Sequence, residues 1–455
     1  MPNSNHEVHV QVLVQISRIA LAEAHGNTSG PSQLCRESEV AQPCRDIASA
    51  AARVVACMAP EQRQAASQEI MLTPGHLIDQ ICKDCSKTLC ASHRMHLASL
   101  NLHYLAAFLS ALSVAAIEES SMASHLLDLV GHLLPLAQQV ASCALAREAS
   151  VADAACALLK ALLAGAGPKA PHLVAHVAPV VQHLFASSGS AECLDVVTKL
   201  AEEAGSADEV AEHSASPHVP AQAVATVDAC LKMVQSGPNA QSLQAQPAVV
   251  SGALRMLCAS TQALPHLFLA AGAVEPLLAF GLQALEAHAL DGAEGALRLL
   301  CCIIMPNDLQ QERCRRHSVC LAAAQEALRV CMHRIVCALL RTLLRRRAGQ
   351  DASANVVAAL LSSMLARHRA EACAALQDVL VDRHAGVVSG TVLSHQDRVT
   401  VVRLLTCQPC LPQRRIVAVL KDVSAMAQGV GHAGTLMAYQ LPPAQNQQLS
   451  AVIEL

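Results

Sequence analysis

Aromatic residues are almost missing from this chain of 455 residues, which has four Phe, two Tyr and no Trp. Because aromatic side chains favour β-strands, their scarcity argues against a sheet protein and leaves Ala, Leu, Val and Cys to fill the core. Charged residues make up only 15% of the chain and apolar residues 53%, which excludes a disordered protein. Ala and Leu are strong helix formers, so the composition predicts an all-α protein.

The chain also lacks a strong net charge, a secretory signal and a catalytic motif. A formal charge of −4 gives no general attraction to nucleic acid. The N-terminal MPNSNHEVHV has no basic region followed by an apolar one. No GxxxxGK[ST] loop, GxSxG elbow or kinase motif set is present. We therefore expect neither an enzyme nor a cofactor.

The longest uncharged stretch, Leu97–Ile117, raises the question of a membrane span. It holds several polar residues, and the segments around it are nearly as apolar, so we interpret it as a buried helix and expect no membrane partner. The 20 Cys are scattered along apolar helical faces. Such Cys behave as small apolar side chains, and their number predicts a reducing compartment, as the cytoplasm and nucleus both are.

Apolar residues recur at helical spacing in segments separated by Pro, Gly, Ser and Asn, including breakers at Pro60 and Pro74. Two successive segments occupy about 35 to 45 residues, the period of HEAT or armadillo repeats. We predict a continuous right-handed α-solenoid of HEAT/armadillo-like helical pairs over residues 1–437 and a loosely ordered polar tail over 438–455. The expected helices are 6–24, 38–58, 74–87, 93–117, 121–146, 150–165, 169–187, 190–205, 218–236, 244–262, 273–288, 290–304, 308–346, 352–366, 368–383, 391–405 and 412–428.

The region Asn355–Gly429 carries the most specific pattern. The helical run NVVAALLSSMLARHRAEACAALQDVL is followed by the hinge VDRHAGVVSGTVLSHQDR and by a last helix, PQRRIVAVLKDVSAMAQG. This order resembles the C-terminal end of a nuclear transport receptor of the importin-β (karyopherin-β) superfamily, in its transportin-SR branch. The resemblance covers most of residues 38–430 through helix order and spacing, and it is most specific in GVVSGTVLSHQDRVTVVRLL.

The resemblance implies a nuclear import receptor-like protein that binds protein cargo, with nucleoporins as further expected partners. Such receptors are roughly twice as long and bind the GTPase Ran mainly through their N-terminal repeats. Because only a C-terminal half is recognised here, as a fragment, a truncated product or a relative without that half, Ran binding is in doubt. A basic row that binds phosphorylated cargo in the family matches Ser150, Ala154, Ala157 and Lys160, so one cation remains.

Acidic residues are concentrated between Glu192 and Glu212, where seven acids stand against one Lys. This charge suits a basic cargo segment. The predicted cargo-binding residues are Glu192, Asp195, Glu202, Glu203, Asp208 and Glu209. The alternative function is an armadillo-like protein–protein interaction scaffold, such as a cytoskeletal or ciliary adaptor, unrelated to transport.

Two other clusters are weaker candidates for sites. Between Asp308 and Arg347 nine Arg stand against three acids, and Arg341, Arg345, Arg346 and Arg347 form a basic patch. Basic residues at a helix C-terminus also complement the helix dipole, which is the simpler interpretation. The spacing of Cys82, Cys85, Cys90 and His93 is compatible with zinc, but the segment between the two half-sites is very short. We therefore predict no metal.

Overall fold

The structure is a computed structural model that describes residues 37–85, 92–116, 120–210, 218–236, 246–270, 272–287, 291–315, 318–345, 351–381, 393–407, 411–428 and 436. Within these ranges every regular element is a helix, as the composition predicts. The chain divides into two compact units, residues 1–237 (unit 1) and 238–455 (unit 2).

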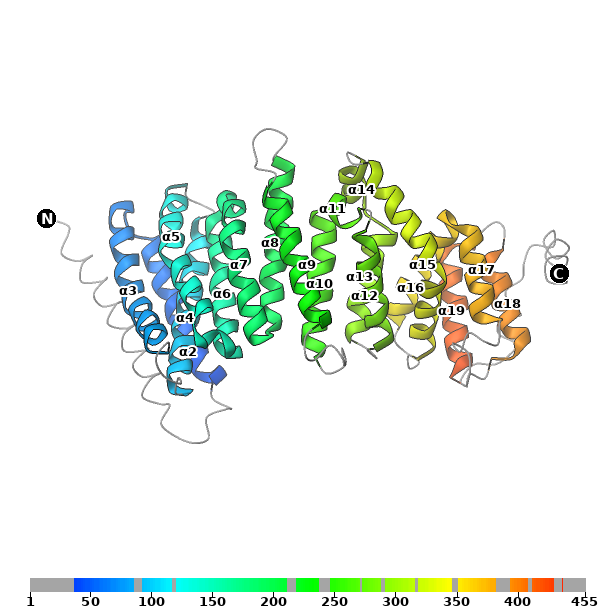
Figure 1. The fold of residues 1–455 in the computed structure, drawn as a ribbon, viewed down its shortest axis with the longest axis horizontal. Helices are drawn as coiled ribbons and strands as arrows, with labels where there is room; N and C mark the ends of the chain where they lie inside the picture. The colour runs from blue at the N-terminus through cyan, green and yellow to red at the C-terminus, as the bar shows by residue number, and fades with distance from the viewer. Residues whose placement is uncertain are drawn as a thin grey trace. The chain divides into compact units, whose positions relative to one another are not determined.

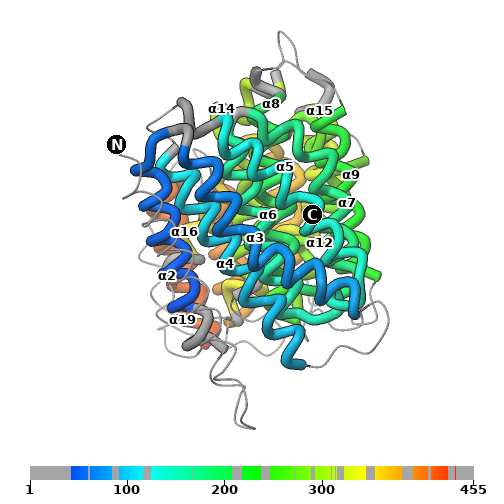
Figure 2. Tube along the Cα trace, turned by 90° about the vertical axis from the view of Figure 1, so that its left-hand side faces the viewer, coloured from blue at the N-terminus to red at the C-terminus, as the bar shows by residue number. Residues whose placement is uncertain are grey.

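Unit 1 consists of helix pairs stacked in two layers (Figure 1). The even-numbered helices α2, α4, α6 and α8 pack in chain order in one layer, and α3, α5, α7 and α9 pack in the other. Figure 2 looks onto its N-terminal end, where α2 and α3 lie beside one another. The bounds are α2 Glu37–Ala56, α3 Pro60–Cys85, α4 Ser92–Ala116, α5 Ser120–Ser142, the 3-10 helix η2 Ala144–Arg147, α6 Ala149–Ala166, the 3-10 helix η3 Gly167–Lys169, α7 Ala170–Ser188, α8 Ala191–Val210 and α9 His218–Ser236.

Small side chains hold the layers of unit 1 together. Ala152 and Ala155 of α6 and Ala98 of α4 are fully buried, and they allow the backbones of these two helices to approach closely. Two of the rare aromatic residues, Tyr104 and Phe108, are fully buried in α4. Apart from such rings, the buried residues of unit 1 are mainly Ala, Leu, Val and Cys, as the sequence predicts.

Two helices of unit 1, α4 and α6, are long and apolar enough to cross a membrane by length and composition. In the structure 61% of the apolar stretch of α4 and 67% of that of α6 are buried inside the protein. Each packs against helices on either side in its own layer and in the other layer. This burial is what the core helices of a solenoid require, since neither can hide its apolar surface alone.

Unit 2 repeats the two-layer arrangement. The helices α10, α13, α16 and α19 pack in one layer, against α12, α15 and α17 in the other. The short helices α11 and α14 contact each other, and α18 lies between α17 and α19 in contact with both. The bounds are α10 Pro247–Ala263, α11 Pro265–Phe268, α12 Val274–Ala287, α13 Asp291–Ile304, α14 Asp308–Arg315, α15 Ser318–Arg345, α16 Asp351–Arg367, α17 Arg369–Leu380, α18 His395–Thr406 and α19 Gln413–Ala427.

One predicted helix start in unit 1 is wrong. Pro74 is predicted to begin a helix, but α3 runs through it from Pro60 to Cys85. Ile70 and Ile78, on either side of the proline, are both buried. The packing of this apolar stripe against α4 and α5 outweighs the local cost of the proline.

The single long helix predicted over 308–346 is also wrong, because the described residues form two helices, α14 and α15. Asn307 and Gln310 start α14 with reciprocal hydrogen bonds of 2.8 Å between each side chain and the other's backbone N–H. The buried stripe from Leu328 to Leu343 belongs to α15 alone. The short polar α14 packs instead on α11 and on α15.

The C-terminal region is described in part. Ser394 and Asp397 form a capping box at the start of α18, which explains where this helix begins. Most of the predicted hinge, residues 382–392, lies outside the described residues, as do the predicted helix 6–24 and the polar tail 438–455.

Close helix packing in unit 2 makes Gly295 of α13 a sensitive position. A methyl group there would lie 3.2 Å from Cβ and 3.1 Å from Cδ1 of Leu254 in α10, and that Cβ cannot move without its helix. We expect Gly295→Ala to lower the free energy of unfolding by roughly 1 kcal/mol, because overpacking outweighs the gain in helix propensity. Urea denaturation would measure it.

The matched control is Gly281→Ala in α12 of the same unit, where the added methyl group would meet only Cδ2 of Leu299, at 3.5 Å. This is an ordinary contact, so we expect Gly281→Ala to be neutral or to stabilise by about 0.5 kcal/mol. Equal effects of the two substitutions would contradict the packing of α10 on α13.

Candidate functional site

An open groove lies on the even-numbered layer of unit 1 and has a volume of about 620 Å³. Four helices contribute to it, so it depends on the stacking of successive helix pairs. Five of its eleven lining residues are alanine, and four carry a charged side chain. The lining residues are Arg45 of α2, His103, Ala106, Ala107 and Ser110 of α4, Asp153, Ala157, Lys160, Ala161 and Ala164 of α6, and Glu192 of α8.

The local sequence explains the position of Glu192. Gly189 ends α7 in the left-handed conformation, with φ 66°, which glycine adopts without strain. Ser190 then caps α8, since its hydroxyl accepts a hydrogen bond of 3.2 Å from the backbone N–H of Glu192. Glu192 thus lies in the first turn of α8, where the helix dipole favours an acid.

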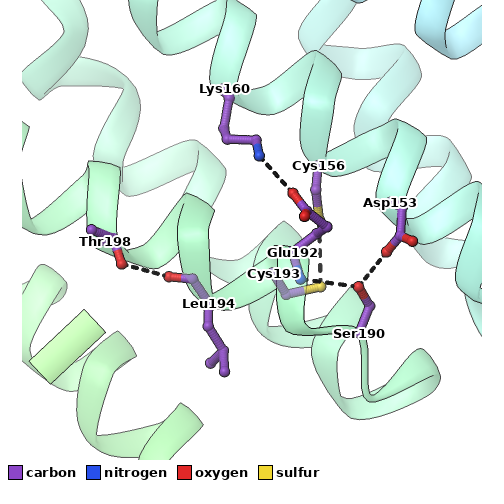
Figure 3. A network of polar contacts seen from close by, with 8 residues as sticks. All are labelled: Asp153, Cys156, Lys160, Ser190, Glu192, Cys193, Leu194 and Thr198. Carbon is purple, nitrogen blue, oxygen red and sulfur yellow. Dashed lines mark hydrogen bonds and ion pairs between the residues drawn. The ribbon is translucent and has the colours of Figure 1, made fainter. Parts of the chain in front are cut away.

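Two polar contacts connect α6 to the start of α8 (Figure 3). Lys160 Nζ lies 2.7 Å from Glu192 Oε2. About two turns earlier on α6, Asp153 Oδ1 accepts a hydrogen bond from the Ser190 hydroxyl. The two side chains of the ion pair remain 36% and 45% exposed, so this pair contributes at most about 1 kcal/mol to stability. Its main effect is on the charge of the groove.

A histidine shares the groove with these charges. Burial, together with the charge of Arg45, lowers the pKa of His103 to about 4, although Glu192 opposes the shift. His103 is therefore neutral at physiological pH. The groove then holds two cations, Arg45 and Lys160, and two acids, Asp153 and Glu192, so its charges balance.

The predicted acidic residues are distributed along α8. Glu192 lies in the groove and is paired with Lys160, and Asp195 is half-buried one turn further on. Glu202 and Glu203 share Lys199 at 3.2 and 3.0 Å, where their hydrogen bonds raise the lysine pKa against the effect of burial. Asp208 and Glu209 belong to α8, but their side chains lie outside the described residues. Cargo binding by this set stays a prediction.

The four positions that the sequence resemblance aligns with a basic row, Ser150, Ala154, Ala157 and Lys160, lie on α6. Ala154 is fully buried and cannot reach a partner, whereas Ala157 and Lys160 line the groove. Sequence reasoning missed Arg45, His103 and Asp153. These residues come together through the register of three helices, and no local pattern marks them.

The basic patch and the zinc candidate can be followed only in part. Arg341 of α15 lies 3.8 Å from Glu286 of α12, while the side chain of Arg345 and all of Arg346 and Arg347 lie outside the described residues. Cys82 is buried and His93 is exposed, and the Cys85 side chain and Cys90 lie outside the described residues. Among the described residues no group of three or more His, Cys, Asp or Glu could hold a metal ion.

Stacked helix pairs in two layers, with an open groove across one layer, define a helical-repeat protein of the α-solenoid class. A solved structure entitled "Importin13 cytosolic state" matches this fold with a TM-score of 0.64 over 92% of the chain, at 13% sequence identity. This likeness confirms the predicted all-α fold of stacked HEAT-like helix pairs. The chain spans 44% of that importin chain. No family model and no curated protein matches the sequence.

Proposed function

We propose that this protein is a scaffold of the nuclear transport receptor type, which binds protein cargo and moves with it between cytoplasm and nucleus. The observation that carries the proposal is the likeness to an importin over 92% of the chain. The groove of unit 1 supports this proposal, because a groove lined by four helices offers a binding surface that a single helix pair lacks. Scaffolds of this kind act by binding, and we assign no catalytic step to the protein.

The groove itself is balanced in charge, but the acids of α8 favour a cargo segment that carries basic groups, and the alanines of the groove leave room for a small apolar side chain. Asp153 and Glu192 contribute the two carboxylates of the groove lining. Further acids along α8, such as Asp195 and Glu202, extend this negative charge beyond the groove. Charges at the rim would guide the approach of the cargo more than they would tighten the complex.

Transport can be separated from simple scaffolding by an import assay. The fluorescently labelled protein would be added to permeabilised cells with and without cytosol, and its accumulation in nuclei measured, alongside binding to purified nucleoporins and to Ran loaded with GTP. We expect nuclear accumulation and nucleoporin binding, with weak or no Ran binding. Exclusion from nuclei together with binding to tubulin or axonemal proteins would favour the alternative, a cytoskeletal or ciliary adaptor.

The groove itself can be tested with two tryptophan variants. Ala164 of α6 is an exposed alanine that lines the groove, and Ala186 of α7 is an exposed alanine in the other layer. We expect Ala164→Trp to fill the groove and weaken cargo binding by about tenfold or more, because a hot-spot contact is typically worth more than 1 kcal/mol. Ala186→Trp should leave the affinity unchanged. Equal effects would remove the groove from the binding site.

The ion pair in the groove leads to a second prediction about binding. In the free protein Lys160 neutralises Glu192. We expect Lys160→Met to strengthen the binding of a basic cargo by roughly threefold to tenfold and to steepen its salt dependence, because the carboxylate no longer shares its charge. Titration calorimetry at two salt concentrations would measure both. Glu192→Gln removes the carboxylate itself and should weaken the binding of the basic cargo. Unchanged affinity in both variants would show that the cargo does not contact Glu192.

A further inference from the structure

Two cysteines far apart in the sequence meet where consecutive helix pairs of unit 1 join. Cys82 lies near the end of α3, and Cys143 follows α5 directly, before the 3-10 helix η2. Their sulfurs are 3.7 Å apart across 61 residues of chain. The sulfurs of a disulfide are about 2.05 Å apart, so these two sulfurs would need to move less than about 2 Å closer to form the bond. This pair belongs neither to the groove nor to the proposed function.

Neighbouring contacts hold the two sulfurs in register. Gln139 of α5 donates a hydrogen bond of 2.8 Å to Asp79 Oδ1 of α3, one turn from the cysteines. The Cys143 sulfur also lies 3.2 Å from the carbonyl oxygen of Val140. Since α3 packs on both α5 and η2, the meeting of the thiols follows from the packing of two helix pairs.

The two thiols differ in access and acidity. Cys82 is only 3% exposed, whereas Cys143 is half-buried and therefore less shielded from a small oxidant. A hydrogen bond from Cys82 and bonds from backbone N–H groups, including that of Leu145, lower the pKa of Cys143 to about 7, although burial opposes the shift. The same hydrogen bond, burial and the nearby Asp79 raise the pKa of Cys82. One thiol is thus suited to attack an oxidant, and the other to stay protonated beside it.

We propose that Cys143 and Cys82 form a redox-modification site that reacts with hydroperoxides, in which Cys143 is the nucleophile and Cys82 the resolving thiol. The Cys143 thiolate attacks one oxygen of hydrogen peroxide, the O–O bond breaks, and a sulfenic acid and hydroxide form. Cys82 then attacks the sulfenic sulfur, its proton goes to the departing hydroxide, and a disulfide and water result. In sum, two thiols and one hydrogen peroxide give one disulfide and two waters. The disulfide ties α3 to the end of α5 and so joins two consecutive helix pairs.

A second pair in the same unit serves as an internal control. The sulfurs of Cys156 in α6 and Cys193 in α8 are closer, at 3.4 Å, but both residues are fully buried (Figure 3). Proximity alone would make this pair oxidise first, whereas access to the oxidant favours Cys82 and Cys143. The order in which the two cysteine pairs oxidise therefore shows whether the distance between the sulfurs or their access to the oxidant controls the reaction.

The test treats the folded 455-residue chain with graded hydrogen peroxide in the presence of a metal chelator. Remaining thiols are blocked with N-ethylmaleimide, and disulfides are mapped by mass spectrometry without reduction. We expect a Cys82–Cys143 cross-link at the lowest peroxide concentration, its reversal by dithiothreitol and an upward shift of the melting temperature. Cys156 and Cys193 should stay reduced until the protein unfolds.

Two variants assign the roles of the thiols. Cys82→Ser should leave Cys143 as a sulfenic acid that dimedone labels, and Cys143→Ser should abolish both this labelling and the cross-link. Earlier oxidation of Cys156 and Cys193 would overturn the proposal, as would a cross-link from Cys143 to Cys85 or Cys90. The absence of sulfenic acid at Cys143 in the folded Cys82→Ser protein would do so as well.

Discussion

Replacing Phe108 with alanine is expected to lower the free energy of unfolding of unit 1 by about 3–5 kcal/mol. The Phe108 side chain is fully buried in α4, the helix that packs on both α2 and α6. A chain with only four Phe has few large side chains that could move into the cavity. Alanines supply much of the buried face of α6, which packs on α4, and they are too small to fill the cavity, so the substitution loses contacts that relaxation cannot restore. Urea denaturation followed by circular dichroism would measure the loss.

Two further substitutions test whether the loss of stability in Phe108→Ala comes from its burial in the core. Val114→Ala, at a side chain of α4 that is 68% exposed, should change stability by less than about 0.5 kcal/mol. Phe280→Ala removes a fully buried ring from α12 in unit 2 and should cost about as much as Phe108→Ala. Because the two rings belong to different units, we expect the double variant to show the sum of both losses. A loss below about 1 kcal/mol for Phe108→Ala would contradict the tight packing of α4.

The helices could be predicted well from the sequence because Ala and Leu repeat at helical spacing over long segments. The predicted helix 93–117, for example, is found as α4 at Ser92–Ala116, and 218–236 is found as α9 with the same ends. The errors occur where tertiary packing overrides a local signal. Pro74 is such a case, because the buried stripe of α3 continues past it. The two helices within Asp308–Arg345 are another case. Helix propensity is similar along the whole segment, so it does not reveal where the polar helix α14 ends and the more apolar helix α15 begins.

The site was less predictable than the fold, because its residues meet through the register between repeats. The charge of α8 is visible in the sequence and led to Glu192, but its partner Lys160 lies on another helix, 32 residues earlier. Cys82 shows the same limit. The sequence relates it to nearby Cys85 and Cys90, whereas its thiol meets Cys143, 61 residues away. No spacing rule connects such positions unless the stacking of the helix pairs is already known.

Acid is expected to destabilise the protein through His103, whose pKa is about 4 in the folded chain because of burial and the charge of Arg45. An unfolded histidine has a pKa of about 6.5. Above that value neither state binds the proton, so the effect is absent. As the pH falls from about 6.5 to 4, the unfolded chain binds a proton that the folded chain does not, and the free energy of unfolding decreases. The accumulated loss is about 2–3 kcal/mol at pH 4 and does not grow further below it.

His103→Gln removes this group, so its stability should fall less than that of the original protein over the same pH interval. Other groups, including buried His125, whose pKa burial also lowers, titrate equally in both proteins and cancel in the difference. His132→Gln, at an exposed histidine of α5, is the matched control and should preserve the original slope. Because protonated His103 would stand beside Arg45 in the groove, the same acidification should weaken binding of a basic cargo to the original protein more than to His103→Gln. If His103→Gln and the original protein lose stability in parallel between pH 7 and 4, the inferred burial of the imidazole in the groove is contradicted.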